Sequence, residues 1–233
     1  MTTANLSNYR KEVVEAAAQI VASGIMTKSL HGNVSMRVPG QDAFLLTAGG
    51  SLANMQPENI ALFQLDGTLI EGTVAPVGAE IIQMHGVVYR KRADMNSVVH
   101  THSPFATGFA VAGKSIPGAY EALVRNGMVD GVPLAAYGPR GSDESVNNIA
   151  AVLDAHEGIK GLLLENHGVL VFGESTGGAV RANVTVEEAA EICLYAYGLG
   201  GPKEIPAHMV KATRERAAEF AAAGSFTADG PKT

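Results

Sequence analysis

The sequence predicts a single α/β domain, in which helices and strands are mixed along the whole chain. The chain has 233 residues, a length that fits one large domain with a substantial core. Helical and strand patterns follow one another, joined by hairpins as well as by longer crossovers. No internal repeat and no long linker divides the chain. We therefore expect one domain over residues 1–224, followed by a mobile tail over residues 225–233.

The elements of the first half are expected from the spacing of their apolar residues. Val13 and Ile20 share one helical face, and Gly24 stands where this first helix can end. Asp66-Gly67 lies between two apolar runs and is typical of a hairpin turn. A second helix is expected after Pro76, where apolar residues return to helical spacing. The run Ser29–Pro39 favours a strand and a turn, and the runs that favour strands are Ala43–Leu46, Ile60–Leu65 and Ser97–His102.

The second half shows the same mixture of elements. Ser142 is expected to cap a helix, because acidic residues follow in the first turn, where the helix dipole favours them. The apolar runs Gly161–Leu164 and Val169–Phe172 are joined by Glu165–Gly168, which is the pattern of a hairpin. Two further helices are expected over Thr176–Tyr197 and Pro206–Ala223.

The composition excludes several classes of partner. The formal net charge is −6 and the pI is about 5.6, and no run of lysine or arginine suits a nucleic acid or an acidic membrane. The single Cys193 excludes an intrachain disulfide framework and a cysteine-based zinc site, and it suits a reducing compartment. The N-terminus lacks the apolar region of a signal peptide, and no apolar run is long enough to cross a bilayer. We therefore expect a cytoplasmic protein that does not bind membranes.

Two histidines one residue apart end the strand expected over Ser97–His102. Residues i and i+2 of a strand point to the same side, so His100 and His102 project together while Thr101 faces away. A third histidine, His167, stands at the expected hairpin tip beside a glycine that lets the backbone come close. Three such imidazoles with an open position are typical of a catalytic metal site. The spacing also fits half-buried histidines that only form hydrogen bonds, so the residues alone leave both interpretations open.

Several stretches together resemble the class II aldolase/adducin family, whose metal-dependent members include sugar-phosphate aldolases, epimerases, decarboxylases and dehydratases. Their order and spacing agree with the family from about Arg10 to Tyr197, and the pair of HTHSP and NHG motifs is specific. The stretches are HGNVSMR (His31–Arg37), LLTAGGSLANMQPENI (Leu45–Ile60), YRKRADMNSVVHTHSP (Tyr89–Pro104), PLAAYGPRGS (Pro133–Ser142) and LLLENHGVLVFG (Leu162–Gly173).

The resemblance implies a single domain with a largely antiparallel central sheet flanked by helices. It also implies that His100, His102 and His167 bind a divalent metal, usually Zn²⁺, with Mn²⁺ or Co²⁺ as alternatives. Family members are commonly homotetramers with active sites between subunits, so the same assembly is expected here. The partner implied for the site is a small-molecule substrate.

The phosphate-binding residues of the aldolases are only partly present. The family uses a Gly-Asn turn, a Thr-x-Ser-Gly loop and a Pro-Ser-Ser-Glu segment. Asn33, Thr47 and Gly50 match this pattern. Gly49 stands in place of the loop serine, and Pro76–Glu80 lacks both serines of the segment, although the N–H groups of the loop can still receive an anion. Because hydroxyl donors are missing at three places, we expect a substrate without a phosphate, bound by Asn33 and the loop from Thr47 to Gly50.

The proton-transfer residue follows the family pattern less closely. The aldolases carry a glutamate four residues before the position of His85, and that place is Ile81 here, with Glu80 one residue further back. Glu80 serves as the catalytic base if a bulge or an altered turn after Gly78 shifts the helix start; otherwise it is a first-turn acid favoured by the helix dipole. Tyr120 stands near the place of a catalytic tyrosine, and packing explains it equally well.

Two lyase activities fit this site. The first is an aldolase that cleaves a small non-phosphorylated hydroxy-carbonyl or hydroxy-acid substrate through a metal-stabilised enolate. The second is a decarboxylase of a β-keto or hydroxy-aromatic acid, which releases CO₂ where the aldolase releases an aldehyde. An epimerase, a dehydratase and a non-catalytic adducin-like protein are the further alternatives, and the presence of all three histidines argues against the last.

Overall fold

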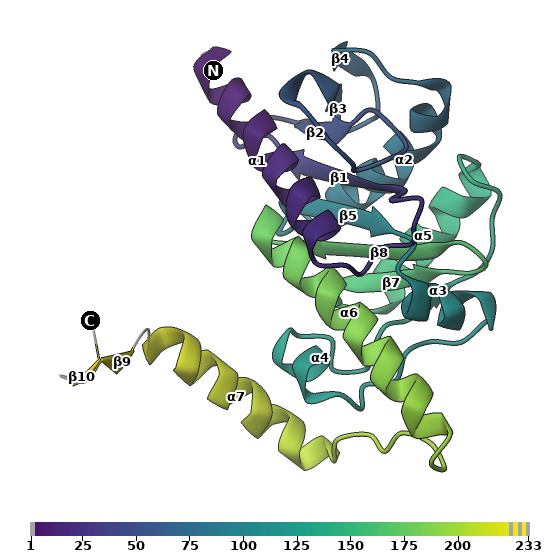
Figure 1. Cartoon of the computed structure of the whole chain (residues 1–233), viewed down its shortest axis with the longest axis vertical. Helices are drawn as coiled ribbons and strands as arrows, with labels where there is room; N and C mark the ends of the chain where they lie inside the picture. Colours follow the sequence, from purple (N-terminus) through teal and green to yellow (C-terminus); the bar gives the residue numbers. More distant parts are fainter. Residues whose placement is uncertain (1–2, 224–225, 228–229, 232–233) are drawn as a thin grey trace.

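The computed structural model describes residues 3–223, 226–227 and 230–231, and it is built around one eight-stranded sheet (Figure 1). The strands of this sheet are β1 (Gly32–Arg37), β2 (Ala43–Thr47), β3 (Ile60–Gln64), β4 (Leu69–Glu71), β5 (Ser97–Thr101), β6 (Leu134–Ala135), β7 (Gly161–Leu164) and β8 (Gly168–Gly173). Their order across the sheet is β4-β3-β2-β1-β5-β8-β7-β6. Every neighbouring pair is antiparallel except β6 and β7, which are parallel. This arrangement confirms the predicted α/β domain with a largely antiparallel sheet.

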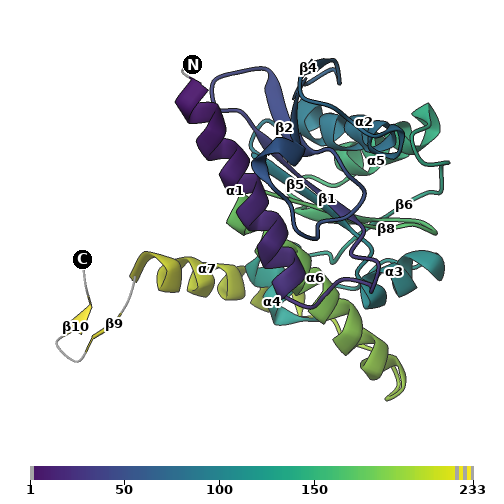
Figure 2. The same ribbon diagram turned by 45° about the horizontal axis from the view of Figure 1, so that its top comes forward.

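Helices cover both faces of the sheet. They are α1 (Thr3–Ala22), α2 (Pro76–Lys91), α3 (Pro104–Val111), α4 (Glu121–Arg125), α5 (Asp143–Ala155), α6 (Thr176–Tyr197) and α7 (Ala207–Ala223), with a 3-10 turn η1 at Pro57–Asn59. One core lies between the sheet and α1, α3, α4 and α6, and it contains Val13, Val99 and Val186. The other core lies between the sheet and α2 and α5, and it contains Ile81 and Val98. Figure 2 shows α1 and α6 on one side of the strands and α2 and α5 on the other.

Strand β5 lies in the middle of the sheet and is buried along its whole length. Its side chains alternate between the two cores, so Val99 packs on the α6 face and Val98 on the α2 face. By the same alternation His100 belongs to the α2 face, and Thr101 belongs to the α6 face, where Asn183 of α6 donates to its hydroxyl. The end of β5 therefore presents polar side chains to both faces of the sheet.

The local predictions are largely confirmed. β3 and β4 form the hairpin predicted at Asp66-Gly67, and β7 and β8 form the one predicted at Glu165–Gly168. Ser142 caps α5, because its hydroxyl accepts a hydrogen bond from the N–H of Ser145 at 3.2 Å. β5 ends at Thr101, one residue before the end of the predicted strand. Helices α3 and α4 were not predicted, and they have only 8 and 5 residues.

The C-terminal helix α7 extends away from the sheet and contacts α4 (Figure 1). Of the predicted mobile tail over residues 225–233, Phe226–Thr227 and Gly230–Pro231 pair as the short strands β9 and β10, and the other residues lie outside the described ones. Among the described residues, no helix combines the length and the apolar character that a membrane span requires.

Candidate metal centre

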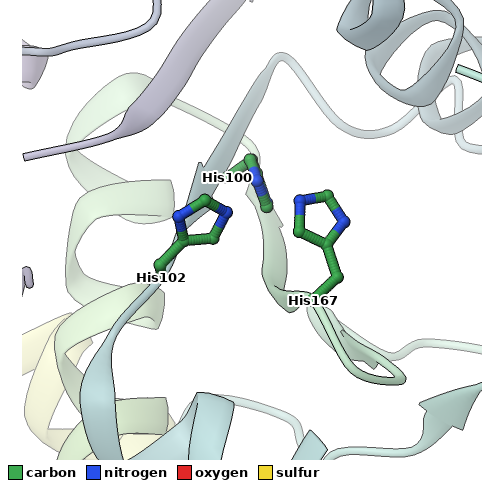
Figure 3. A group of neighbouring side chains, drawn as sticks. All are labelled: His100, His102 and His167. Atoms are coloured by element: carbon green, nitrogen blue, oxygen red, sulfur yellow. The ribbon is translucent and has the colours of Figure 1, made fainter. Parts of the chain in front are cut away.

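Three histidines from two distant segments meet at the end of β5 (Figure 3). His100 lies on β5, His102 directly follows that strand, and His167 lies on the turn between β7 and β8. The ring centroids lie 4.9 Å apart for His100 and His102, 4.7 Å for His100 and His167, and 5.1 Å for His102 and His167. One nitrogen of each ring lies within 4.8 Å of a nitrogen of each other ring. The structure therefore brings the three predicted ligands together.

Hydrogen bonding and burial leave ring nitrogens of this group able to bind a cation. Nδ1 of His100 lies 2.8 Å from the carbonyl oxygen of Val169. That oxygen can only accept, so Nδ1 carries the proton and Nε2 keeps its lone pair. Nε2 of His102 is buried and has no hydrogen-bond partner among the described residues. A buried nitrogen without a partner is costly, and a bound cation would remove that cost.

Burial also keeps the three imidazoles neutral. It lowers the pKa of His100 well below its usual value, and the neighbouring histidines act in the same direction. Burial likewise lowers the pKa of His102, and it lowers the pKa of His167 to about 4. Neutral imidazole is the form that binds a metal. Three neutral nitrogen ligands fit a divalent transition metal and leave coordination positions for a substrate.

The turn that carries His167 depends on two small or adaptable residues. Asn166 has a φ of +56°, a left-handed conformation that asparagine adopts more readily than most residues. The N–H of His167 donates to the carbonyl of Leu164 at 3.0 Å and closes the turn. A Cβ atom at Gly168 would lie 2.6 Å from the carbonyl oxygen of Thr101. Only glycine therefore lets β8 come this close to the end of β5.

A fourth histidine, His85 of α2, is fully buried but does not belong to the ligand group. Its Nδ1 lies 2.7 Å from the hydroxyl oxygen of Ser35, which lies 2.7 Å from the hydroxyl oxygen of Tyr89. Its Nε2 is buried without a hydrogen-bond partner in the described part of the chain. Burial lowers the pKa of His85 to about 3, so its ring is neutral near pH 7.

Glu80 forms an ion pair with Arg140, a residue of the loop that precedes α5. Oε2 of Glu80 lies 2.5 Å from Nε of Arg140, and both side chains are partly exposed. Gly141, at a φ of +78°, lies so close that a Cβ atom there would be 3.0 Å from Cβ of Glu80. The charge of Arg140 adds to burial in lowering the pKa of His102 and of His167. The ion pair therefore lies in the neighbourhood of the metal centre.

The residue at which α2 begins decides whether Glu80 or Ile81 faces the core. Glu80 is the fifth residue of a helix that begins at Pro76, so its interpretation as a first-turn acid is wrong. The bulge or altered turn considered after Gly78 does not occur, because α2 is one continuous α-helix. Ile81, at the position where the family carries its glutamate, is buried in the core with 4% exposure. The irregularity on which the sequence made the base role depend is therefore absent. A role for Glu80 at the site depends instead on its exposure and on its ion pair with Arg140.

Tyr120 lies on the other face of the sheet. It directly precedes α4, and it packs against the core that α6 covers. The histidine group lies on the α2 face. In the described part of the chain no hydrogen bond or ring contact joins Tyr120 to these histidines. The structure therefore does not bring Tyr120 to the metal centre of its own chain.

The predicted substrate-binding residues lie in and beside the loop that follows β2. Nδ2 of Asn33 donates to the carbonyl of Gly49 at 3.3 Å, and the buried hydroxyl of Thr47 accepts from the N–H of Val34 at 3.2 Å. These bonds hold the loop against β1. The N–H groups of Gly49 and Gly50 donate to no acceptor within the described residues. A pocket of about 420 Å³ opens beside the loop, lined among others by Ala48, Gly49, Gly50, Ser51, Asn59 and Thr73.

A larger pocket of about 730 Å³ lies between α4 and α7, and it contains none of the predicted site residues. Volume alone therefore does not identify the site, and the convergence of the histidines does.

Two residues near the metal centre were not predicted. The ring of His31 lies 6.4 Å from that of His102 at an interplanar angle of 71°. The charge of Arg140 acts on His102 and His167 and helps to lower the pKa of both, and the same residue forms the ion pair with Glu80. His31 lies in the motif HGNVSMR, and Arg140 lies in the motif PLAAYGPRGS. Their place inside these motifs could have marked them as site residues. A lone histidine and a lone loop arginine, however, can each equally be an ordinary surface residue.

Known proteins share this sequence pattern and this fold. Residues 11–194 match the family model described as "Class II Aldolase and Adducin N-terminal domain". The chain is 30% identical over 206 residues to "5-deoxy-D-ribulose 1-phosphate aldolase" of Bacillus thuringiensis serovar kurstaki, covering 86% of this chain and 91% of the relative. It is 29% identical over 208 residues to "5-methylthioribulose-1-phosphate/5-deoxyribulose-1-phosphate aldolase" of Rhodospirillum rubrum, covering 89% and 90%. A solved structure of "L-fuculose 1-phosphate aldolase" has the same fold, with a TM-score of 0.80 at 24% identity, over 89% of this chain and 94% of that one.

These relatives overturn one prediction. The expectation of a substrate without a phosphate is wrong, because the similar enzymes are named for phosphorylated sugars. The physical reason is that the prediction considered only side-chain hydroxyl groups as donors to a phosphate. Main-chain N–H groups of a glycine-rich loop and of a helix N-terminus also bind phosphate. The unused N–H groups of Gly49 and Gly50 are donors of this kind.

Proposed function

Because the chain belongs to the class II aldolase and adducin family, we propose that it is a metal-dependent aldolase that cleaves a ketose 1-phosphate. The observation that carries the proposal is the convergence of His100, His102 and His167 as three neutral nitrogen ligands. The names of the two similar aldolases support the substrate class, since both are named for ribulose-type 1-phosphates. Retro-aldol cleavage of such a ketose breaks the bond between C3 and C4 and gives dihydroxyacetone phosphate and an aldehyde.

The three histidines would hold the metal. His100 would use Nε2, because its Nδ1 donates to Val169. Zn²⁺ suits three imidazole ligands, and Mn²⁺ and Co²⁺ are the alternatives. When bound, the cation supplies positive charge that favours the negative charge developing beside a carbonyl as a carbon–carbon bond breaks.

The phosphate would bind mainly to backbone groups. Gly49 and Gly50 offer N–H groups that no described residue uses. The start of α2 lies against the same loop, since a Cβ atom at Gly78 would be 2.8 Å from the carbonyl oxygen of Ala48. The N-terminus of this helix brings the positive end of its dipole to the loop. Asn33 holds the loop in place through Gly49, and these backbone donors would take the place of the missing serine hydroxyl groups.

Glu80 is the base in this proposal. Its carboxylate would take the proton from the C4 hydroxyl of the ketose, and Arg140 would orient it through their ion pair. Tyr120 stays a candidate for proton transfer only in a site shared between subunits, because it lies on the opposite face of its own chain. The homotetramer with shared sites and the cytoplasmic location remain predictions from the sequence.

The test measures products from the purified chain reloaded with Zn²⁺, Mn²⁺ or Co²⁺. Given 5-deoxyribulose 1-phosphate, we expect dihydroxyacetone phosphate and acetaldehyde in equal amounts, and a chelator should abolish both. The same sugar without its phosphate is the matched control and should react far more slowly. Stoichiometric metal with no cleavage of any ketose 1-phosphate would contradict the activity, and CO₂ release from a β-keto acid would favour the decarboxylase alternative.

A further inference from the structure

A buried polar cluster lies on the face of β5 opposite the metal centre, and the proposed chemistry does not use it. Thr101, Ser103 and Asn183 are all fully buried. The hydroxyl oxygens of Thr101 and Ser103 lie 2.8 Å apart. Nδ2 of Asn183 donates to Oγ1 of Thr101 at 3.0 Å. The cluster therefore ties the residues on both sides of His102 to helix α6.

Glu187, one turn further along α6, caps helix α3. Its carboxylate accepts hydrogen bonds from the N–H groups of Phe105 and Ala106, both at 2.9 Å, and the residue is only 5% exposed. These N–H groups belong to the first turn of α3 and have no acceptor within that helix. Ser103 directly precedes α3 but forms no side-chain cap, and its hydroxyl group lies beside Thr101 instead. Glu187 thus takes the role of a local cap from a distant part of the sequence.

Asn183 and Glu187 act on one continuous segment. They are four residues apart and therefore lie on the same face of α6. Between them they hold the chain from Thr101 to Ala106, and His102 lies inside this segment. On the other face, Nε2 of His102 has no hydrogen-bond partner among the described residues, so no bond to that nitrogen orients the ring.

We propose that Asn183 and Glu187 are positioning residues of the metal centre, which fix where His102 presents its ring by holding the chain before and after it. The inference rests on the proposed metal site. Metal ligands are oriented by the groups behind them, and loss of such support weakens metal binding. A cap that only stabilised the fold would instead change stability and leave the metal site as it is.

The test compares Glu187→Gln with two control variants in the full chain. Glutamine keeps the size of the side chain but replaces one acceptor oxygen with an NH₂ group, which cannot accept from a backbone N–H. Glu188→Gln makes the same charge change at an exposed neighbour. Val186→Ala lowers stability through a cavity in the adjoining core of α6 and removes no hydrogen bond to the segment from Thr101 to Ala106. We measure Zn²⁺ affinity by competition with a chelator and record the visible absorption of the Co²⁺-loaded protein.

Glu187→Gln should bind Zn²⁺ about 10-fold or more weakly and show an altered Co²⁺ spectrum. Both controls should keep the wild-type affinity and spectrum. If Glu187→Gln does not fold, Thr101→Val, which removes one hydroxyl at nearly constant volume, is measured with the same expectation. An unchanged affinity and spectrum, or losses equal to those of Val186→Ala at a matched melting temperature, would overturn the inference. A wild-type chain that binds neither metal would overturn the proposed function instead.

Discussion

The neutral state of buried His85 leads to a measurable prediction for the stability of the metal-free protein. Burial lowers the pKa of His85 to about 3 in the folded chain, from an ordinary value of 6.5. Between these two values the unfolded chain binds a proton that the folded chain does not bind, so the folded state loses stability as the pH falls below 6.5. The loss is about 1.4 kcal/mol per pH unit, which amounts to about 2 kcal/mol between pH 8 and pH 5.

The substitution His85→Gln isolates this contribution. Glutamine stays uncharged over the whole range, and its amide can still form a hydrogen bond with Ser35. The free energy of unfolding is measured in urea at pH 8 and pH 5, with a chelator present so that the other histidines contribute to both proteins alike. The wild type should lose about 2 kcal/mol more than the variant. Parallel pH dependences would refute the reasoning, and so would an NMR titration in which the His85 ring takes up its proton near pH 6.5.

Three further predictions concern the site itself. His102→Ala should remove metal and activity while the far-ultraviolet circular dichroism stays that of the wild type; metal analysis checks this, and full activity in the variant would exclude His102 as a ligand. Gly168→Ala should lower both the melting temperature and the Zn²⁺ affinity, because its Cβ would lie 2.6 Å from the carbonyl oxygen of Thr101, and an unchanged affinity would contradict this reading of the turn. Glu80→Gln should slow ketose cleavage by a factor of about 10² at saturating substrate, whereas exposed Glu144→Gln should leave the rate unchanged; equal rates would move the base elsewhere.

Local periodicity predicted the mixed α/β domain and the place of each histidine, whereas the antiparallel sheet and the metal-binding role came from the family resemblance. Alternation along β5 placed His100 and His102 on one side, and the Glu165–Gly168 turn placed His167 at a hairpin tip. The meeting of these two segments is a consequence of the strand order, since β5 and β8 are direct neighbours. The residue pattern within one strand does not show which strands are neighbours in the sheet. The resemblance to a family was therefore needed to choose the metal interpretation.

The surroundings of Glu80 could not be predicted in the same way. One helical position separates Glu80 from Ile81, and a rotation of about 100° per residue decides which of them enters the core. The ion pair with Arg140 joins residues 60 positions apart in the sequence. The phosphate prediction failed for a related reason, because it considered side chains only, whereas the N–H groups of Gly49 and Gly50 are donors that every non-proline residue carries.

The glycines of the HGN and NHG motifs have a common steric role at the end of β5. A Cβ atom at Gly32 of β1 would lie 2.8 Å from the carbonyl oxygen of His100, and one at Gly168 of β8 would lie 2.6 Å from that of Thr101. β1 and β8 are the two neighbours of β5, so the strand that carries the ligands is closely approached from both sides at the same level. Each glycine is next to a polar residue assigned to the site: Asn33 follows Gly32, and His167 precedes Gly168. The two glycines thus let both neighbouring strands approach the end of β5, and Gly168 brings the turn that carries His167 next to His100 and His102.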